Sequence, residues 1–447
     1  MQELRVSKSQ VLAALSRALD LVEGQPEGHA ERTAVIALGI ARQMGLSQAD
    51  RENLAYAALL KDSGCSNNAV RIQKIFGGDE HLAKRAVKEI DWSSPIESIK
   101  FAWQYTEVGQ SLGQKLRRMA ANIGPPNKVM NEVTEARCTR GAEIAKMLSF
   151  SPDVAEAILY LDEHWNGKGA PYGKKQEEIP LLSRILGLAQ SLEVFVTGYG
   201  IDEALAMAEA RSGKWFDPDT VLACRILCHQ SEFWNGLHEP DWLSRELPHL
   251  QTEAMDSDID AICEAFAMII DAKSSFTSEH STRVMTYSVA LGRQLGFSPM
   301  RLQHLRRAAL LHDIGKLGVP TGVLEKPGKL DDAEFAKIKL HPELGEAILG
   351  RIPGFEYAAE IAGRHHERLD GKGYWRGLQA DQLSVDVRVV TVCDVFDALS
   401  ADRPYRDALP MEKVWEILEG DRGRAFDPEC LDALRSWTDG DSLARAA

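Results

Sequence analysis

The chain has 447 residues, of which 44% are hydrophobic and 26% are charged, and this length allows two domains of ordinary size, each with its own core. Its formal net charge of −14 at pH 7 excludes a general surface for DNA or for an anionic membrane, because phosphate groups would be repelled over most of the molecule. Any anionic ligand must therefore be held by local positive charge.

The N-terminal segment and the cysteines predict a cytoplasmic protein. Residues 1–10 are mixed and polar, and no uninterrupted apolar stretch approaches transmembrane length, so we expect no membrane segment. Seven cysteines without a Cys-x-x-Cys pair are typical of a reducing compartment. Cys224 and Cys228, with His229 beside them, could suggest zinc, but their apolar setting favours the packing of a helix face.

Apolar residues recur at helical spacing along the chain, whereas alternating strand patterns are scarce, so the sequence predicts an all-α fold. The best candidate for a domain boundary is a proline-containing, acidic stretch that precedes a new apolar helix at Ile259. We therefore expect a domain over residues 1–247, a linker over residues 248–258 and a second domain over residues 259–447.

The two predicted domains share a sequence pattern. Residues 57–64, with Asp20, His29 and Arg32 before them, align without a gap on residues 308–315, with Asp271, His280 and Arg283 before them. A second ungapped block aligns residues 137–190 with residues 341–394, and a Phe-Asp-Pro triplet that we interpret as structural follows in both copies. Two blocks in the same order predict that the chain contains two copies of one helical domain.

The copies differ at five of seven polar positions near the ends of apolar helices. In the second copy these positions hold His280, His312, Asp313, His341, His365, His366 and Asp394. Their counterparts in the first copy are His29, Lys61, Asp62, Arg137, Leu161, Asp162 and Gln190. Lys61 and Arg137 would put a fixed positive charge where a cation would lie, and Leu161 cannot ligate a metal. The contrast indicates a functional unit that the first copy has lost, where His29 and Asp62 could hold at most one weakly bound metal.

The segment Leu-Leu-His-Asp-Ile-Gly-Lys, residues 310–316, is the centre of this unit. A buried pair joined only by a hydrogen bond would explain His312 and Asp313 taken alone. The full set of five imidazoles and two carboxylates suits two iron or manganese ions better than one zinc or magnesium ion, and Asp313 is the natural bridge. Two such ions lower the pKa of a shared water and clamp a phosphoryl oxygen. We therefore predict two divalent metal ions, iron or manganese, held by the seven residues.

Basic residues near this unit predict contacts with a phosphate group. Lys316 lies one turn past Asp313, and Arg403 and Arg406 offer planar forks for bidentate phosphate binding. A solvated surface role would explain each of them alone. Their joint absence from the first copy, which has Cys65, Tyr199 and Asp202 instead, favours phosphate binding.

The loop Asp-Gly-Lys-Gly-Tyr-Trp, residues 370–375, predicts further contacts with the ligand. Gly373 lets the backbone approach a ligand closely, and Tyr374 with its aromatic neighbour can stack on a base. We therefore expect Lys316, Gly373, Tyr374, Arg403 and Arg406 to bind the substrate.

The second copy, from about Ile259 to Leu434, resembles an HD-GYP domain, a family of bacterial phosphodiesterases that act on cyclic dinucleotides. The resemblance rests on His312-Asp-Ile-Gly-Lys316, His341-Pro-Glu-Leu-Gly345, His365-His-Glu-Arg368, Asp370-Gly-Lys-Gly-Tyr374 and Asp394-Val-Phe-Asp-Ala-Leu399. It implies two tandem HD-type domains, the first of them degenerate, and a site with two or three iron or manganese ions. It also implies hydrolysis of cyclic di-GMP to the linear dinucleotide pGpG or on to GMP.

Two departures from the family pattern affect these expectations. The Gly-Tyr-Pro triplet is replaced by Gly373-Tyr374-Trp375, which leaves the substrate preference open. Members with three metals carry a glutamate one turn before the first histidine, and Phe276 at that position favours two.

The sequence-based hypothesis is a metal-dependent phosphodiesterase acting on cyclic di-GMP, with Asp313 and Lys316 as catalytic residues. A first alternative is hydrolysis of 3',3'-cyclic GMP-AMP. A second is a scaffold that binds a cyclic dinucleotide without cutting it, and a third is a nucleotide phosphohydrolase with a single metal. The first copy is predicted to serve regulation, homodimer formation or the binding of a signalling partner.

Overall fold

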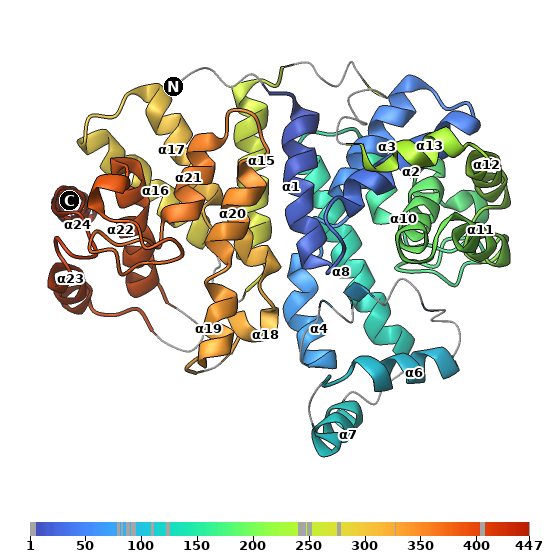
Figure 1. Cartoon of the computed structure of the whole chain (residues 1–447), viewed down its shortest axis with the longest axis horizontal. Helices are drawn as coiled ribbons and strands as arrows, with labels where there is room; N and C mark the ends of the chain where they lie inside the picture. The colour runs from blue at the N-terminus through green and yellow to red at the C-terminus, as the bar shows by residue number, and fades with distance from the viewer. Residues whose placement is uncertain are drawn as a thin grey trace. The chain divides into compact units, whose positions relative to one another are not determined.

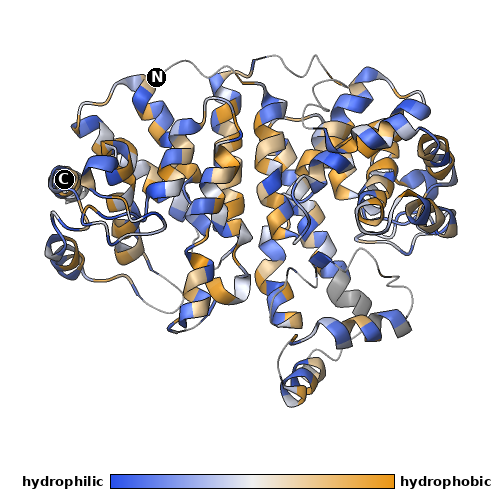
Figure 2. Cartoon of the chain, viewed as in Figure 1, coloured by the Kyte–Doolittle hydropathy of each residue, from blue (hydrophilic) through white to orange (hydrophobic). Residues whose placement is uncertain are grey.

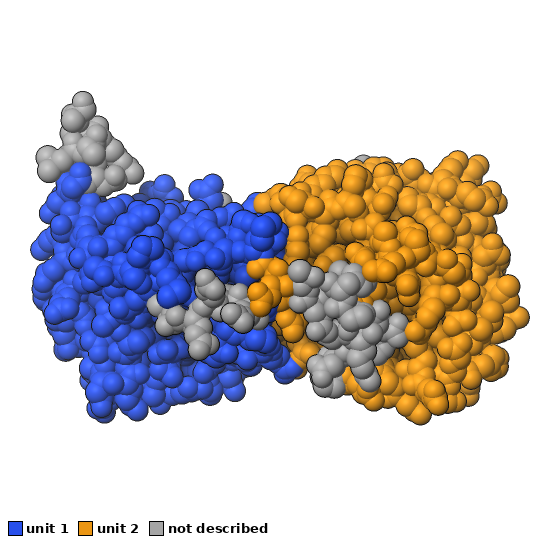
Figure 3. Space-filling model, turned by 90° about the horizontal axis from the view of Figure 1, so that it is seen from above, with its two compact units in different colours: residues 1–6, 255–447 blue, residues 7–254 orange. Residues whose placement is uncertain are grey.

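The structure is a computed structural model that describes residues 6–77, 81, 84–85, 90, 95–108, 111–121, 126–239, 247, 253–274, 279–326, 328–402 and 407–446. These residues form α-helices and short 3₁₀-helices joined by loops, with isolated β-bridges and no strand among them (Figure 1). The predicted all-α fold is confirmed. Two compact units make up the chain: an N-terminal unit of residues 7–254, and a C-terminal unit of residues 255–447 together with residues 1–6 (Figure 3).

The N-terminal unit is built around α2 and α10, which pack on each other and on α3. A capping box between Ser7 and Gln10 starts its first helix, because each side chain bonds the other residue's backbone N–H. The helices of the unit are α1 (Lys8–Val22), α2 (His29–Gln43), α3 (Gln48–Leu60), η1 (Ser66–Asn68), α4 (Ala69–Phe76), α6 (Pro95–Tyr105), α7 (Leu112–Ala121), α8 (Pro126–Met147), α9 (Pro152–Leu159), η2 (Gln176–Glu178), α10 (Leu181–Tyr199), α11 (Ile201–Ala210), α12 (Pro218–Cys228), α13 (Ser231–Asn235) and η3 (Gly236–His238).

Helix α10 differs from the expectation about apolar stretches. The helix is long and apolar enough to cross a membrane by length and composition, although the sequence pattern predicted no such stretch. Of its most apolar window, 61% is buried inside the unit. Since α10 packs on α2, α3, α9 and α12, it is a core helix of this unit.

In the C-terminal unit, α16 packs on α15, α17, α22 and α24, and α20 packs on α21. Hydrophobic residues concentrate on the helix faces that pack within each unit (Figure 2). The helices are α15 (Asp256–Asp271), α16 (His280–Gln294), α17 (Pro299–Leu311), η5 (Ile314–Gly318), α18 (Thr321–Leu324), α19 (Asp332–Ile338), α20 (His341–Leu349), α21 (Glu356–Arg364), η6 (Ala380–Gln382), α22 (Val385–Ser400), α23 (Met411–Gly420) and α24 (Pro428–Ala446).

The two units repeat one arrangement of helices. Pairs α2 and α16, α3 and α17, and α10 and α22 hold the aligned segments of the two copies. A serine caps the start of both members of the second pair. The side chains of Ser47 and Ser298 each accept a hydrogen bond from the backbone N–H three residues later in the chain. The same local signals therefore build the same framework twice.

The Phe-Asp-Pro triplet has a structural role in both units. Its aspartate receives a guanidinium N–H from the arginine of the preceding long helix, at 2.6 Å between Arg184 and Asp217 and at 2.8 Å between Arg388 and Asp427. Asp217 also caps α12 by accepting from the backbone N–H of Asp219.

Candidate metal centre

His312 and Asp313 lie at the C-terminal end of α17. His312 is the C-cap residue of that helix and is completely buried, and Asp313 follows it with 1% of its surface exposed. The Nδ1 atom of His312 lies 2.7 Å from the carbonyl oxygen of Ala309. Because that nitrogen donates its hydrogen to the carbonyl, the lone pair of the ring is on Nε2.

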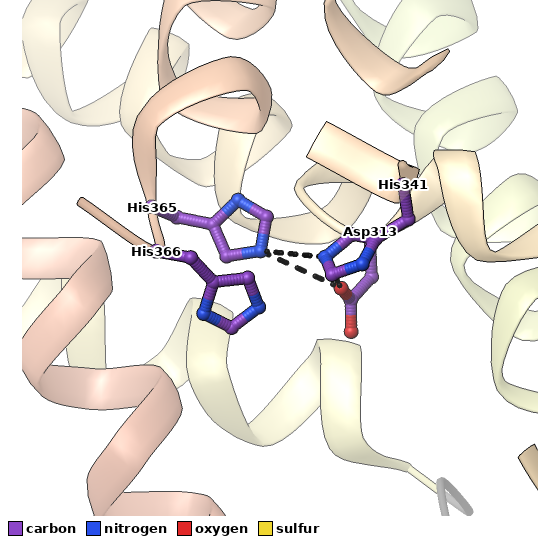
Figure 4. Close-up of side chains that lie close together, drawn as sticks. All are labelled: Asp313, His341, His365 and His366. Atoms are coloured by element: carbon purple, nitrogen blue, oxygen red, sulfur yellow. Dashed lines mark hydrogen bonds and ion pairs between the residues drawn. The ribbon is translucent and has the colours of Figure 1, made fainter. Parts of the chain in front are cut away.

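His341 and His365 are oriented in the same way. Their Nδ1 atoms donate to the carbonyl oxygens of Ile338 and Ala362, at 2.7 Å and 2.8 Å. Their Nε2 atoms lie 3.2 Å apart, and 3.4 Å and 3.6 Å from Oδ1 of Asp313 (Figure 4). Two lone pairs facing each other at this distance, beside a carboxylate oxygen, are favourable only with a positive charge between them.

His280 is the first residue of α16, and a carboxylate fixes its ring. Its Nδ1 atom lies 2.7 Å from Oδ2 of Asp397, which also receives the guanidinium of Arg283. Its Nε2 atom lies 3.5 Å from Oδ2 of Asp313 and 3.3 Å from Oδ1 of Asp394. The ring therefore presents Nε2 to two carboxylates at once.

Asp313 lies between the two sets of ligand atoms. Its Oδ1 atom faces His341 and His365, and its Oδ2 atom lies 3.4 Å from Nε2 of His312 and 3.5 Å from Nε2 of His280. A carboxylate whose two oxygens face different groups has the geometry of a bridge between two cations.

All seven predicted ligand residues converge in two buried groups. One group comprises Asp313, His341, His365 and His366, and the other comprises His280, His312 and Asp394. Asp394 also links the groups, because its Oδ2 atom lies 3.9 Å from Nδ1 of His366.

Unpaired buried atoms indicate that this donor set fits metal ions. Within the described part of the chain, Nε2 of His280, Nε2 of His312 and Oδ1 of Asp313 make no hydrogen bond. An unpaired polar atom costs about 1–3 kcal/mol when buried, and a cation shared between the atoms would remove that cost. Neutral imidazoles and carboxylates are ligands that first-row transition metals accept.

The charges of the groups suit the same role. Burial lowers the pKa of His341 to about 3 and that of His366 well below its usual value, so both rings are neutral with an available lone pair. Burial opposes the ionisation of Asp313, but Lys316 and His312 outweigh it and hold its pKa well below the usual range. Burial also opposes a charge on His280, but its neighbours Asp313, Asp394 and Asp397 outweigh that effect and raise its pKa, so a metal ion at this ring would have to displace a proton.

A close backbone approach at Gly315 brings His341 to Asp313. A Cβ atom at Gly315 would lie 1.9 Å from the carbonyl oxygen of His341 and 2.8 Å from the nitrogen of Gly345. Only glycine fits there. In the N-terminal unit, Gly64 approaches Arg137 in the same way, which makes this contact part of the shared framework.

The predicted catalytic lysine contacts the predicted bridge. Nζ of Lys316 lies 2.5 Å from Oδ2 of Asp313, and 21% of its side chain is exposed. Its ammonium is therefore at the edge of the centre, next to the two groups of predicted ligands.

In the loop of residues 370–375, the structure places two predicted substrate contacts against the protein. Tyr374 stacks on the ring of His366, with centroids 4.8 Å apart. Gly373 packs against the backbone of Glu367, since a Cβ atom would lie 2.4 Å from its Cα. Tyr374 thus contacts a predicted metal ligand, and the binding of substrate by Gly373 and Tyr374 stays a prediction. Arg403, Arg406 and Phe276 lie outside the described residues.

Two supporting residues were missed by sequence reasoning. Asp397 orients His280, and Glu367, which is 1% exposed, accepts hydrogen bonds from the backbone of residues 376–378 and so closes the loop. Both positions are acidic in both copies, as Glu193 and Glu163 in the first. The shared acid is the signal in the sequence, and a contrast between the copies does not contain it.

The aligned positions of the N-terminal unit form ion pairs among themselves. Lys61 contacts Asp62, and Arg137 contacts Asp162. Gln190 donates a hydrogen bond of 3.1 Å from Nε2 to Oδ1 of Asp162. In the N-terminal unit, the charged groups of Lys61 and Arg137 therefore lie where metal ions are predicted in the C-terminal unit.

The cysteines considered for zinc lie on α12, with their sulfur atoms 3.9 Å apart and Cys224 buried in the core. Among the described residues they form no group with a histidine.

Comparisons with known proteins agree with the fold and the site. The HD domain family matches residues 81–220 and 264–430. A protein of Vibrio cholerae serotype O1 named 3'3'-cGAMP-specific phosphodiesterase 3 is 43% identical over 96% of this chain and 94% of its own length. The cyclic di-GMP phosphodiesterase response regulator RpfG of Xanthomonas campestris is 41% identical over 38% of this chain and 45% of its own length. A crystal structure of a cyclic GMP-AMP specific phosphodiesterase of V. cholerae matches with a TM-score of 0.66 and 39% identity, over 97% of this chain and 98% of the other.

The helical framework, which the HD domain family matches twice, and the buried His-Asp centre of the C-terminal unit define a protein of the HD domain family, to which this chain belongs. Its relatives place it among the HD-GYP phosphodiesterases, which confirms the resemblance found in the sequence.

Proposed function

We propose that the chain is a metal-dependent phosphodiesterase that hydrolyses the cyclic dinucleotide 3',3'-cyclic GMP-AMP. The observation that carries this proposal is the relative named for that substrate, which is 43% identical over nearly the whole of both chains. The sequence-based hypothesis put cyclic di-GMP first, and the relatives support its alternative better. Hydrolysis of cyclic di-GMP is the second candidate, because RpfG and other cyclic di-GMP phosphodiesterases match 38–39% of this chain.

The seven converging residues would hold two divalent ions, which we propose to be iron or manganese. When bound, such a pair activates a water molecule and stabilises the charge that develops on the phosphoryl oxygens. The proposal is supported by the two ligand groups and by the position of Asp313 between them.

The residues of the chain then act by holding and orienting groups. The backbone carbonyls behind His312, His341 and His365 accept hydrogen bonds from the Nδ1 atoms and so direct each Nε2 atom inward. Lys316 would exchange its contact with Asp313 for a phosphate oxygen, and Arg403 and Arg406 would bind the phosphates from their segment.

The N-terminal unit lacks five of the seven ligand residues and keeps the framework, so a regulatory or dimerisation role is proposed for it. A cytoplasmic location stays a prediction from the sequence.

A substrate panel tests the activity. Anaerobically purified protein, loaded with iron or manganese, is incubated with 3',3'-cyclic GMP-AMP and with cyclic di-GMP, and products are separated by chromatography. We expect linear product from the first at the higher kcat/KM. Faster hydrolysis of cyclic di-GMP would reverse the order of the candidates, and no product from either would reject the enzyme in favour of a binding scaffold.

Elemental analysis of the same preparation tests the centre. We expect two metal ions per chain, whereas one ion would favour a single-metal phosphohydrolase.

A further inference from the structure

The N-terminal unit keeps a cavity where the C-terminal unit has its centre. The cavity has a volume of about 750 Å³, within the range of small-molecule sites. Its lining includes Arg137, Leu161, Asp162 and Gln190, which align with His341, His365, His366 and Asp394. The unit therefore lost the ligand residues of this place without filling the space.

Two tryptophans line the cavity at positions where the C-terminal unit has no aromatic residue. Trp215 stacks on His164, with centroids 4.3 Å apart and planes 19° apart, and Trp165 lies beneath the guanidinium of Arg184 at 5.6 Å. The residues at the aligned positions of the two tryptophans are Leu369 and Ala425. An aromatic wall provides contact for a planar ring system.

Unpaired polar atoms of both kinds line the same cavity. Oε1 of Gln190 is an acceptor, Nε of Arg137 and Nε of Arg184 are donors, and none of the three makes a hydrogen bond within the described part of the chain. Gln190 is 6% exposed. Since buried unpaired atoms are costly, the lining is suited to a ligand that offers both donors and acceptors.

The charges of the lining restrict the ligand further. Its cations Lys84, Arg137, Lys168 and Arg184 match its carboxylates Glu23, Asp162, Glu163 and Asp217 in number. Arg137, Arg184 and Lys84 pair with three of those carboxylates, and Lys168 is exposed. The interior thus suits an uncharged ring, with a single phosphate next to Lys168.

We propose that this cavity is a binding site for a purine nucleotide, with the base against the aromatic wall and its polar edge on Gln190. The ligand is either a free mononucleotide or one half of a cyclic dinucleotide, since both carry this chemistry. The proposal is independent of the proposed activity, because none of its residues belongs to the C-terminal unit.

Titration calorimetry on the full chain tests the site. GMP, AMP, 3',3'-cyclic GMP-AMP and cyclic di-GMP are titrated into metal-loaded protein and into protein treated with EDTA, which silences the metal centre. We expect binding that survives EDTA. Gln190→Leu and Trp165→Leu should each weaken it about tenfold, through loss of a hydrogen bond and of an aromatic contact. If only the mononucleotides bind, or only the cyclic dinucleotides bind, the result identifies which of the two is the ligand of the cavity.

Gln43→Leu is the matched control, because Gln43 lies at the end of α2 and does not line the cavity. The proposal is overturned if no nucleotide binds after EDTA, or if Gln190→Leu and Trp165→Leu both bind nucleotide as Gln43→Leu does. Thermal melts check that the variants fold. Hydrolysis is measured in parallel, so that binding without hydrolysis would reject the proposed activity and leave this site standing.

Discussion

At the scale of single residues, the metal centre depends on atoms that never face it. His280 is held through Nδ1 by Asp397, and His312, His341 and His365 are held through Nδ1 by backbone carbonyls. Three of these hydrogen bonds are to backbone carbonyls and cannot be removed by substitution of the accepting residue. The hydrogen bond to Asp397 can be removed in this way.

We therefore expect Asp397→Asn to impair the centre although Asp397 is not a predicted ligand. The substitution removes the negative charge that orients His280 and neutralises Arg283, and such a loss typically reduces metal affinity or activity by about 10–100-fold. Metal content and kcat/KM measure the effect. Glu193→Gln, the equivalent change in the N-terminal unit, is the control and should leave both unchanged. Equal values for Asp397→Asn and the parent protein would contradict the assignment.

Gly315→Ala should displace His341 from the centre. The added methyl group would lie 1.9 Å from a backbone oxygen, so the start of α20 must move away from η5. We expect less bound metal and a folded protein, as measured by elemental analysis and circular dichroism. Gly420→Ala has no atom within 4 Å of the added group and serves as the control. Full metal content in Gly315→Ala would mean that α20 accommodates the shift.

The seven residues of the centre could be found from the sequence because the two copies disagree at five of them. Asp397 and Glu367 escaped because an acid stands at both positions in both copies, so a comparison of copies gives them no contrast. The packing of Tyr374 on His366 could not be predicted, because it depends on a loop path that no sequence pattern specifies.

At the scale of helices, one triad joins the first and last aligned helices in each unit. In the N-terminal unit His29 and Arg32 of α2 hold Glu193 of α10, with Nε of Arg32 at 2.7 Å from the carboxylate. In the C-terminal unit His280 and Arg283 of α16 hold Asp397 of α22, an aspartate in place of the glutamate. The triad is therefore part of the framework that both units share, and its task in the N-terminal unit is to join α2 to α10.

This task predicts a loss of stability in acid. Burial opposes the ionisation of Glu193, but His29 and Arg32 outweigh it and lower its pKa to about 2. A carboxylate with a depressed pKa stabilises the fold above its unfolded value of about 4.5, and that stabilisation is lost as the pH falls toward 2. The shift corresponds to about 3 kcal/mol of unfolding free energy. Denaturant unfolding of the N-terminal unit as a function of pH measures it.

Glu193→Gln should lower the free energy of unfolding at pH 7. It should also make that free energy depend less on pH between about pH 5 and pH 2. A profile that is as steep in the variant as in the parent would assign the acid sensitivity to other carboxylates.

At the scale of the whole molecule, two units with separate cores carry the same framework and one predicted metal centre. Metal should therefore stabilise one unit only. A ligand present at 1,000 times its Kd adds about 4 kcal/mol to the unit that binds it. In calorimetric scans with and without EDTA, we expect one of two transitions to shift with metal, and Glu193→Gln to shift the other. A single transition that moves with both would show that the units unfold together.

The fold class and the duplication were predictable at this scale, because helical periodicity and ungapped self-alignment are properties of the sequence itself. The cavity of the N-terminal unit was not. It depends on the volume left when four ligand positions change residue type, and volume is set by packing in three dimensions.

The ion pairs inside the N-terminal unit also limit its evolution. Returning Lys61 to histidine would take away the cation beside Asp62, and returning Arg137 would do the same to Asp162. Breaking the buried Lys61–Asp62 pair from one side costs about 3–5 kcal/mol, and the loss is smaller for the partly exposed Arg137–Asp162 pair, so the first of these steps back is strongly destabilising. Descendants of this chain can change what the silent half recognises far more readily than they can make it an enzyme again.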